Sequence, residues 1–134
     1  MTEEYELQEC MIEISTTVDG VETRIKRKGG LKLSVGEVKL FYLDEQAEVT
    51  LLLQGETATI DRKGDYTLHL VLENGKITQG VLGIRGAEGE MQALTHKITY
   101  SVTQNSLLAS LKYALLLGGE PQEMQIRISA RLVK

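Results

Sequence analysis

Three arginines are the residues of this sequence whose chemistry and position most suggest a binding site. Arg27, Arg62 and Arg85 each end a run in which every second residue is apolar, so strand alternation places them on the inward face. These runs are the second, sixth and eighth along the chain, and even-numbered strands of an up-and-down barrel finish at the same end. Guanidinium forks match carboxylate and phosphate groups. The sequence therefore predicts an anion-binding site at one barrel opening, with Tyr42 or Tyr100 lining the interior; the alternative is that the arginines reach into water at the strand ends.

The charge of such a site requires compensation. Cations that face a low-dielectric interior repel one another unless an anion or buried carboxylates balance them. We therefore expect one of two arrangements at this opening. One is a bound anion or a water-filled pocket, and the other is an acidic partner such as Glu90.

Catalytic and metal chemistry find little support in the residue types. His69 and His96 would need a third nearby ligand to hold zinc, such as Glu90 or Asp65, and nothing in the spacing demands it. No serine or cysteine is flanked by a plausible base, and the carboxylates lie mostly at solvent-facing positions. The sequence predicts no catalytic residue, no metal and no cofactor, so a binding protein is favoured over an enzyme.

Charge and aromatic content argue against nucleic acid as a partner. The chain has 15 basic and 19 acidic residues, a net charge of −4, with one phenylalanine and no tryptophan to stack on bases. The basic segment from Arg24 to Lys32 alternates, which is typical of a solvated face that protects strands from unwanted pairing. No apolar run approaches the length of a membrane span, and the acidic N-terminus has no secretory pattern. We expect a cytoplasmic protein without a nucleic-acid or membrane partner.

The elements that must position the arginines are β-strands. Apolar and polar residues alternate along most of the chain, and Asp19-Gly20 and Asn74-Gly75 are strong hairpin signals. With Gly29-Gly30 taken as a further turn, we count about eleven strand segments at spacings of about 8–12 residues. The sequence predicts an all-β fold, a closed antiparallel calycin- or lipocalin-like barrel of about 8–11 strands, because closure removes exposed edges. The inward-facing core is predicted to contain Ile12, Ile14, Ile25, Leu40, Ile60, Leu68, Leu70, Ile98, Tyr100, Leu111, Ile126 and Ile128.

One segment fits two interpretations. Residues 106–117 have a capping Asn105-Ser106, leucines at helical spacing and a terminal Gly118-Gly119, as a helix would. Read as a strand, the same segment places Leu107, Leu111 and Leu115 on one side. The local pattern leaves both structures open.

Several short motifs together resemble the YwiB-like family of small bacterial proteins, a domain of unknown function with a calycin-like β-barrel. They are Lys28-Gly29-Gly30, the segment 36–42, the segment 60–64, the Asn74-Gly75 hairpin, and Leu111-Lys112-Tyr113 before Gly119-Glu120. The resemblance spans about residues 10–133. It implies a strand for residues 106–117, and it implies no established activity.

The whole chain, residues 1–134, is expected to form a single β-barrel domain, with residues 1–6 frayed. The predicted function is that of a small non-catalytic protein that binds a small, partly apolar anionic ligand in the barrel. The alternative is a protein-interaction or structural module with a packed interior, because small barrels either fill with side chains or hold one ligand. The sequence does not determine the oligomeric state.

Overall fold

Ten antiparallel strands form one closed β-barrel in the computed structural model, which describes residues 7–116 and 118–133. Each strand pairs with its neighbours in sequence, and the first also pairs with the last. The predicted fraying of residues 1–6 falls outside the described residues. The strands are β1 (Gln8–Val18), β2 (Val21–Ser34), β3 (Glu37–Asp44), β4 (Ala47–Gln54), β5 (Thr57–Lys63), β6 (Tyr66–Glu73), β7 (Ile77–Ile84), β8 (Ala87–Val102), β9 (Ser106–Leu116) and β10 (Gln122–Leu132).

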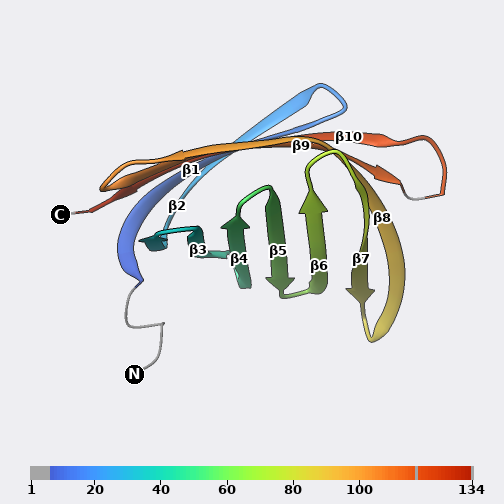
Figure 1. The fold of residues 1–134 in the computed structure, drawn as a ribbon. Helices are drawn as coiled ribbons and strands as arrows, with labels where there is room; N and C mark the ends of the chain where they lie inside the picture. Colours follow the sequence, from blue (N-terminus) through green and yellow to red (C-terminus); the bar gives the residue numbers. More distant parts are fainter. Residues whose placement is uncertain (1–6, 117, 134) are drawn as a thin grey trace.

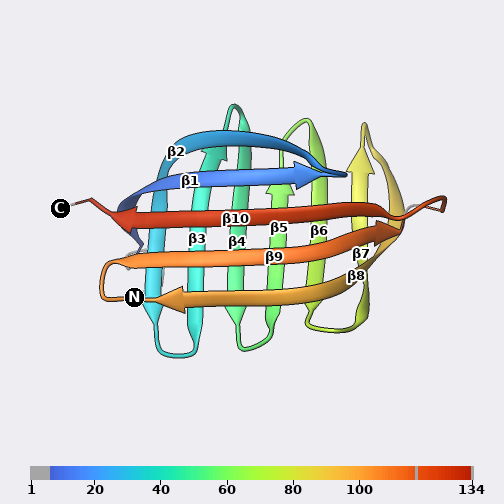
Figure 2. The ribbon, with the colours of Figure 1, turned by 90° about the horizontal axis from the view of Figure 1, so that it is seen from above.

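The barrel is flattened into two layers whose strands cross almost at right angles. Figure 2 shows the upper layer of Figure 1, β1, β9 and β10, running across the view in front of the lower layer, the perpendicular strands β3 to β7. The long strands β2 and β8, of 14 and 16 residues, bend from one layer into the other (Figures 1 and 2). Orthogonal packing of this kind needs strands that turn a corner.

Each corner has a local cause. In β2 the bend contains Gly29, where an added Cβ would lie 2.2 Å from the Phe41 carbonyl oxygen and 2.7 Å from Ile12 Cδ1. In β8 the pairing with β9 shifts register between Thr95 and Lys97, as at a β-bulge. The prediction that Gly29-Gly30 is a turn is therefore wrong, because the glycines let a continuous strand bend instead. The barrel consequently has ten strands and not eleven segments.

Residues 106–116 form a strand and not a helix. β9 pairs with β8 on one side and with β10 on the other, and its buried residues alternate from Leu107 to Tyr113. The helix signals of this segment are overridden because both ladders satisfy its backbone groups. Leu117 lies outside the described residues.

The predicted core is confirmed at all twelve positions. Seven of these side chains are buried, and Ile25, Ile60, Leu68, Tyr100 and Ile126 are partly buried and pack against them. Among the described residues, the contiguous core receives side chains from every strand except β7. The described part of the chain has no helix long and apolar enough to cross a membrane.

Candidate functional site

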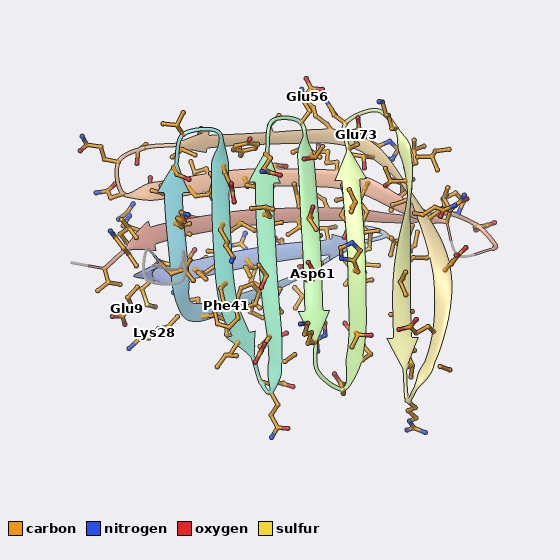
Figure 3. The ribbon with its side chains drawn as sticks, turned by 60° about the horizontal axis from the view of Figure 1, so that its bottom comes forward. Glu9, Lys28, Phe41, Glu56, Asp61 and Glu73 are labelled. Atoms are coloured by element: carbon orange, nitrogen blue, oxygen red, sulfur yellow. The ribbon has the colours of Figure 1, made fainter. Side chains whose placement is uncertain are left out.

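A group of charged and aromatic side chains gathers at one opening of the barrel. We call Arg27, Tyr42, Asp44 and Arg62 the mouth cluster; its two neighbours are Asp65 and Tyr66. The turns β3–β4, β5–β6 and β7–β8, which carry or adjoin most of these residues, lie along one edge of the lower layer (Figures 2 and 3).

Sheet register explains why residues distant in sequence meet here. One row crosses four strands through the pairs Gly29–Tyr42, Tyr42–Val49 and Val49–Arg62. Alternation places Arg27 and Asp44 on the same inward face, two residues from Gly29 and Tyr42 respectively. The three charged residues of the cluster therefore come from β2, β3 and β5 and face the same opening.

Asp44 joins the two arginines. Arg27 Nη2 donates to Asp44 Oδ1 at 2.8 Å, and Arg62 Nη1 donates to Asp44 Oδ2 at 3.4 Å. These side chains are half-buried, with Arg62 the least exposed at 17%. Arg62 Nη2 also donates to Asp65 Oδ1 at 3.2 Å, and its guanidinium lies 4.4 Å from the ring centroid of Tyr66. One carboxylate thus faces two guanidinium groups, one from each oxygen.

The surroundings shift the ionisation of the cluster. Burial works against the charge of Arg62, but Tyr66, Asp65 and Asp44 outweigh it and raise its pKa. Burial, with the Asp44 carboxylate adding to it, raises the pKa of Tyr42 to about 12 against the opposing effect of both arginines. The Nε of Arg62 is buried and meets no hydrogen-bond partner among the described residues. The cluster therefore holds permanent cations and a neutral phenol at neutral pH.

Arg85 does not join the mouth cluster. It lies in the β7–β8 turn with a φ of +53°, and it is exposed. The pairs Leu70–Gly80 and Leu68–Leu82 show that β7 turns Gly80 and Leu82 inward. The predicted inward position of Arg85 is wrong, because the apolar residues that it follows, Ile77 and Val81, face outward.

Arg85 nevertheless lies on the same rim of the barrel. It lines a hollow of about 570 Å³ together with Asp65, Tyr66 and Glu88. Asp65 and Tyr66 both contact Arg62, so this hollow adjoins the mouth cluster.

Tyr100 lies at the edge of the barrel opposite the mouth cluster. Its hydroxyl donates to the Gly55 carbonyl at 3.1 Å, in the β4–β5 turn. Figure 3 labels Glu56 in this turn, on the edge opposite the β3–β4 turn. Of the predicted site residues, the structure brings together Arg27, Arg62 and Tyr42, and it leaves Arg85 beside them and Tyr100 apart.

The acidic partner of the arginines is Asp44 and not Glu90. Glu90 is exposed and pairs with the outward-facing Val81. Asp44 follows Leu40 and Tyr42 on the inward side of β3, and this alternation is the signal that could have identified it from sequence.

The histidines form separate pairs on the surface. His69 Nδ1 lies 2.6 Å from Asp61 Oδ1 on the outward face of the barrel, where Figure 3 labels Asp61. His96 Nε2 lies 3.1 Å from Glu123 Oε1. Within residues 7–116 and 118–133 there is no group of three or more histidine, cysteine or acidic side chains able to hold a metal.

Comparisons with known proteins support the architecture. The family model described as "Domain of unknown function (DUF1934)" matches residues 12–128. The crystal structure of the ywiB protein from Bacillus subtilis is similar, with a TM-score of 0.84 at 14% identity over 100% of both chains. At this identity the likeness shows the fold alone. No protein with a curated description matches the sequence.

Proposed function

Because the chain belongs to the YwiB-like family of the DUF1934 domain, whose function is unknown, we propose a function from the chain's own geometry. The protein is a non-catalytic binding module that takes the acidic group of a small, partly apolar anion at the Arg27–Arg62 opening. We expect it to act in the cytoplasm. We also expect it to act without nucleic acid, in keeping with its net charge of −4.

The observation that carries this proposal is the position of the Asp44 carboxylate. It lies between two half-buried guanidinium groups and accepts a hydrogen bond from each. A ligand carboxylate or phosphate has the same acceptor geometry. Asp44 is the last residue of β3 and precedes Glu45, whose φ is +59°, so its side chain belongs to the rim and not to the packed centre. A ligand can therefore bind in its place.

The filled interior determines where the rest of the ligand lies. The buried core is contiguous, so the ligand body stays at the rim and does not enter the barrel centre. The adjoining 570 Å³ hollow offers the Tyr66 ring, Thr67 and Ala87 as its walls, with Arg85 beside the carboxylates of Asp65 and Glu88. A short apolar tail fits there, within the volume range of small-molecule sites.

Isothermal titration calorimetry with hexanoate and with inorganic phosphate tests this proposal. We expect Arg62→Gln to abolish binding and Asp44→Asn to strengthen it about tenfold, because the internal competitor is removed while the arginines remain. Arg131→Gln, an exposed arginine on the outward face of β10, is the matched control and should bind like the wild type. Thermal melts of each variant separate lost binding from lost folding. Unchanged affinity in Arg62→Gln would overturn the proposal.

A second candidate is an interaction or structural module whose interior is only a scaffold. The contiguous core favours it, since such a barrel needs no ligand to be stable. Native mass spectrometry of freshly purified protein separates the two candidates. A co-purifying mass of a few hundred daltons supports the carrier, whereas a bare chain together with silent titrations supports the module.

A further inference from the structure

A groove crosses the outward face of the upper layer. Its β2 end, Lys26, is next to Arg27 of the mouth cluster in sequence, but Arg27 faces inward. It encloses about 680 Å³ and lies over β2, β1, β10, β9 and β8, the strands in front in Figure 2. Each of the five strands contributes three consecutive residues to it. These are residues 24–26, 13–15, 127–129, 108–110 and 99–101.

Sheet register shows how the groove is built. The central residues of the five triplets are paired in one continuous row, Ile25–Ile14–Ile128–Ala109–Tyr100. Their side chains belong to the core or pack against it, so only their backbone forms the groove floor. The flanking residues point outward in two rows: Lys26, Glu13, Ser129, Leu108 and Ser101, and Arg24, Ser15, Arg127, Ser110 and Thr99.

The dimensions suit a single extended chain. Five strands spaced about 4.8 Å apart give a groove about 19 Å long, and two rows two residues apart leave it about 7 Å wide. A helix, about 10–12 Å across, is too wide. An extended segment of about five or six residues spans this length.

The side chains that line the groove can form hydrogen bonds with a peptide backbone. Half of the ten flanking side chains carry hydroxyls, which both donate and accept hydrogen bonds and so can meet the N–H and C=O groups of an extended backbone. The floor backbone is already paired in ladders, so a partner is held by side chains and not by strand addition. Tyr100 is the one aromatic residue in the lining that the described residues form, and it turns inward, which leaves no stacking surface there for a base or sugar.

The charges of the lining favour an acidic ligand over a basic one. Among the described residues, the lining holds three cations, Arg24, Lys26 and Arg127, and one carboxylate, Glu13, which pairs with Lys26 at 3.7 Å, on a chain whose net charge is −4. At this cationic end Glu22 already accepts hydrogen bonds from Ser15 Oγ and from Arg24 Nε, the latter at 3.0 Å. The hydrogen bond from Ser15, then Arg24, and to a smaller degree the nearby Arg127 lower the pKa of Glu22. The end of the groove is thus able to hold a carboxylate.

We propose that this cross-strand groove docks an extended acidic peptide segment of a partner protein. An acidic side chain of the segment meets Arg24 and Arg127, the backbone lies on the hydroxyls, and an apolar residue meets Leu108, whose side chain is exposed. The groove is separate from the anion site proposed above, so either can fail without the other.

Fluorescence polarisation with two labelled eight-residue peptides tests this. One alternates glutamate with alanine and the other alternates lysine with alanine. We expect the acidic peptide to bind with a salt-sensitive affinity and the basic one not to bind. Arg127→Glu should weaken binding at least about tenfold by charge reversal. Ser110→Trp should do the same by filling the groove without changing charge.

The controls separate this site from general attraction. Arg131→Glu reverses a charge on the same face of β10 outside the groove lining and should bind like the wild type. Circular dichroism melts confirm that the variants fold. Equal binding of both peptides, or full binding by both groove variants, would overturn the proposal. So would displacement of the peptide by single-stranded DNA or triphosphate at equal affinity, since the groove would then bind polyanions by charge alone.

Discussion

At the scale of single residues, burial changes the pKa of two tyrosine hydroxyls. Tyr42 sits beside the two arginines and Asp44, and Tyr113 on β9 is almost wholly buried, with 3% of its surface exposed. For both phenols, desolvation is the main cause of a pKa raised to about 12. Both phenols therefore stay protonated at pH values well above 10, the usual pKa of a tyrosine.

The raised pKa values predict a loss of stability at alkaline pH. The unfolded phenols ionise near pH 10, so between about pH 10 and pH 12 the folded state binds more protons than the unfolded one. The stabilisation is complete below pH 10 and is lost as the pH rises through 12, by up to about 2–3 kcal/mol for each tyrosine. Urea unfolding at several alkaline pH values measures this slope.

Absorbance titration of tyrosinate provides the control. Tyr42 and Tyr113 should ionise only near pH 12 in the folded protein. The double variant Tyr42→Phe/Tyr113→Phe should lose this late step and show a flatter pH dependence. An unchanged late step in that variant would contradict the assignment.

Core and surface positions of neighbouring strands should differ sharply in stability. Ile12→Ala removes a fully buried side chain and is expected to cost about 2–5 kcal/mol, since the close-packed core cannot refill the space. Lys26→Ala, whose side chain is 75% exposed, should change the free energy of unfolding by less than about 0.5 kcal/mol. Chemical denaturation of both variants checks the inward and outward assignment, which similar losses would refute.

At the scale of the element, the bends in β2 and β8 decide the architecture. The β2 bend brings Gly29 so close to β3 and β1 that a side chain has no room. The same bend carries β2 from the layer of β1 into the layer of β3, which places Arg27 near the corner where it reaches Asp44 (Figure 1).

Alanine at Gly29 should therefore be costly. Its Cβ would collide with the Phe41 backbone oxygen, which cannot move aside without disturbing the ladder between β2 and β3, so we expect a loss of about 3 kcal/mol or more. Gly89→Ala is the matched control, because nothing lies within 4 Å of its added Cβ. A thermal melt of each variant measures the difference, and equal melting temperatures would show that the corner tolerates a side chain.

Closure governs the whole molecule. β1 and β10, from the two ends of the chain, pair along nine residues, and the Val133 N–H donates to the Glu9 carbonyl at 3.0 Å. Every described strand therefore has two neighbours, which leaves no edge open to aggregation. The ladder that joins the ends has the largest sequence separation, so it carries the highest loop-closure cost during folding.

A circular permutant tests whether connectivity matters to this closed sheet. Joining the chain ends by a short Gly-Ser linker and opening the exposed β2–β3 turn between Val35 and Gly36 should preserve the barrel, since every strand pair is kept. Opening the chain inside β9, between Leu111 and Lys112, should prevent folding because it cuts a strand paired on both sides. Circular dichroism melts distinguish a cooperative β-sheet protein from an unfolded chain.

Local patterns were sufficient for the class of fold and for the inward face of most strands. Alternation with a period of two identified all twelve core residues, and Asp19 and Gly20 both take the positive φ that their hairpin turn requires. The same alternation turned Arg27 and Arg62 inward. For residues 106–116 local signals did not suffice, and the family resemblance correctly favoured the strand.

The tertiary structure alone decided what depends on register and on bends between distant strands. The strand count depended on Gly29, where the same dipeptide can turn a chain or bend a strand. In β7, Gly80 faces inward, so Ile77 and Val81 face outward, opposite to the face that alternation predicted for them. Arg85 consequently lies in the turn and not on the inward face. The contact of Asp44 with both arginines and the five-strand groove arise from pairings between residues far apart in sequence. Only the closed sheet sets these pairings, because a shift of one residue in any ladder would turn every side chain of that strand to the other face.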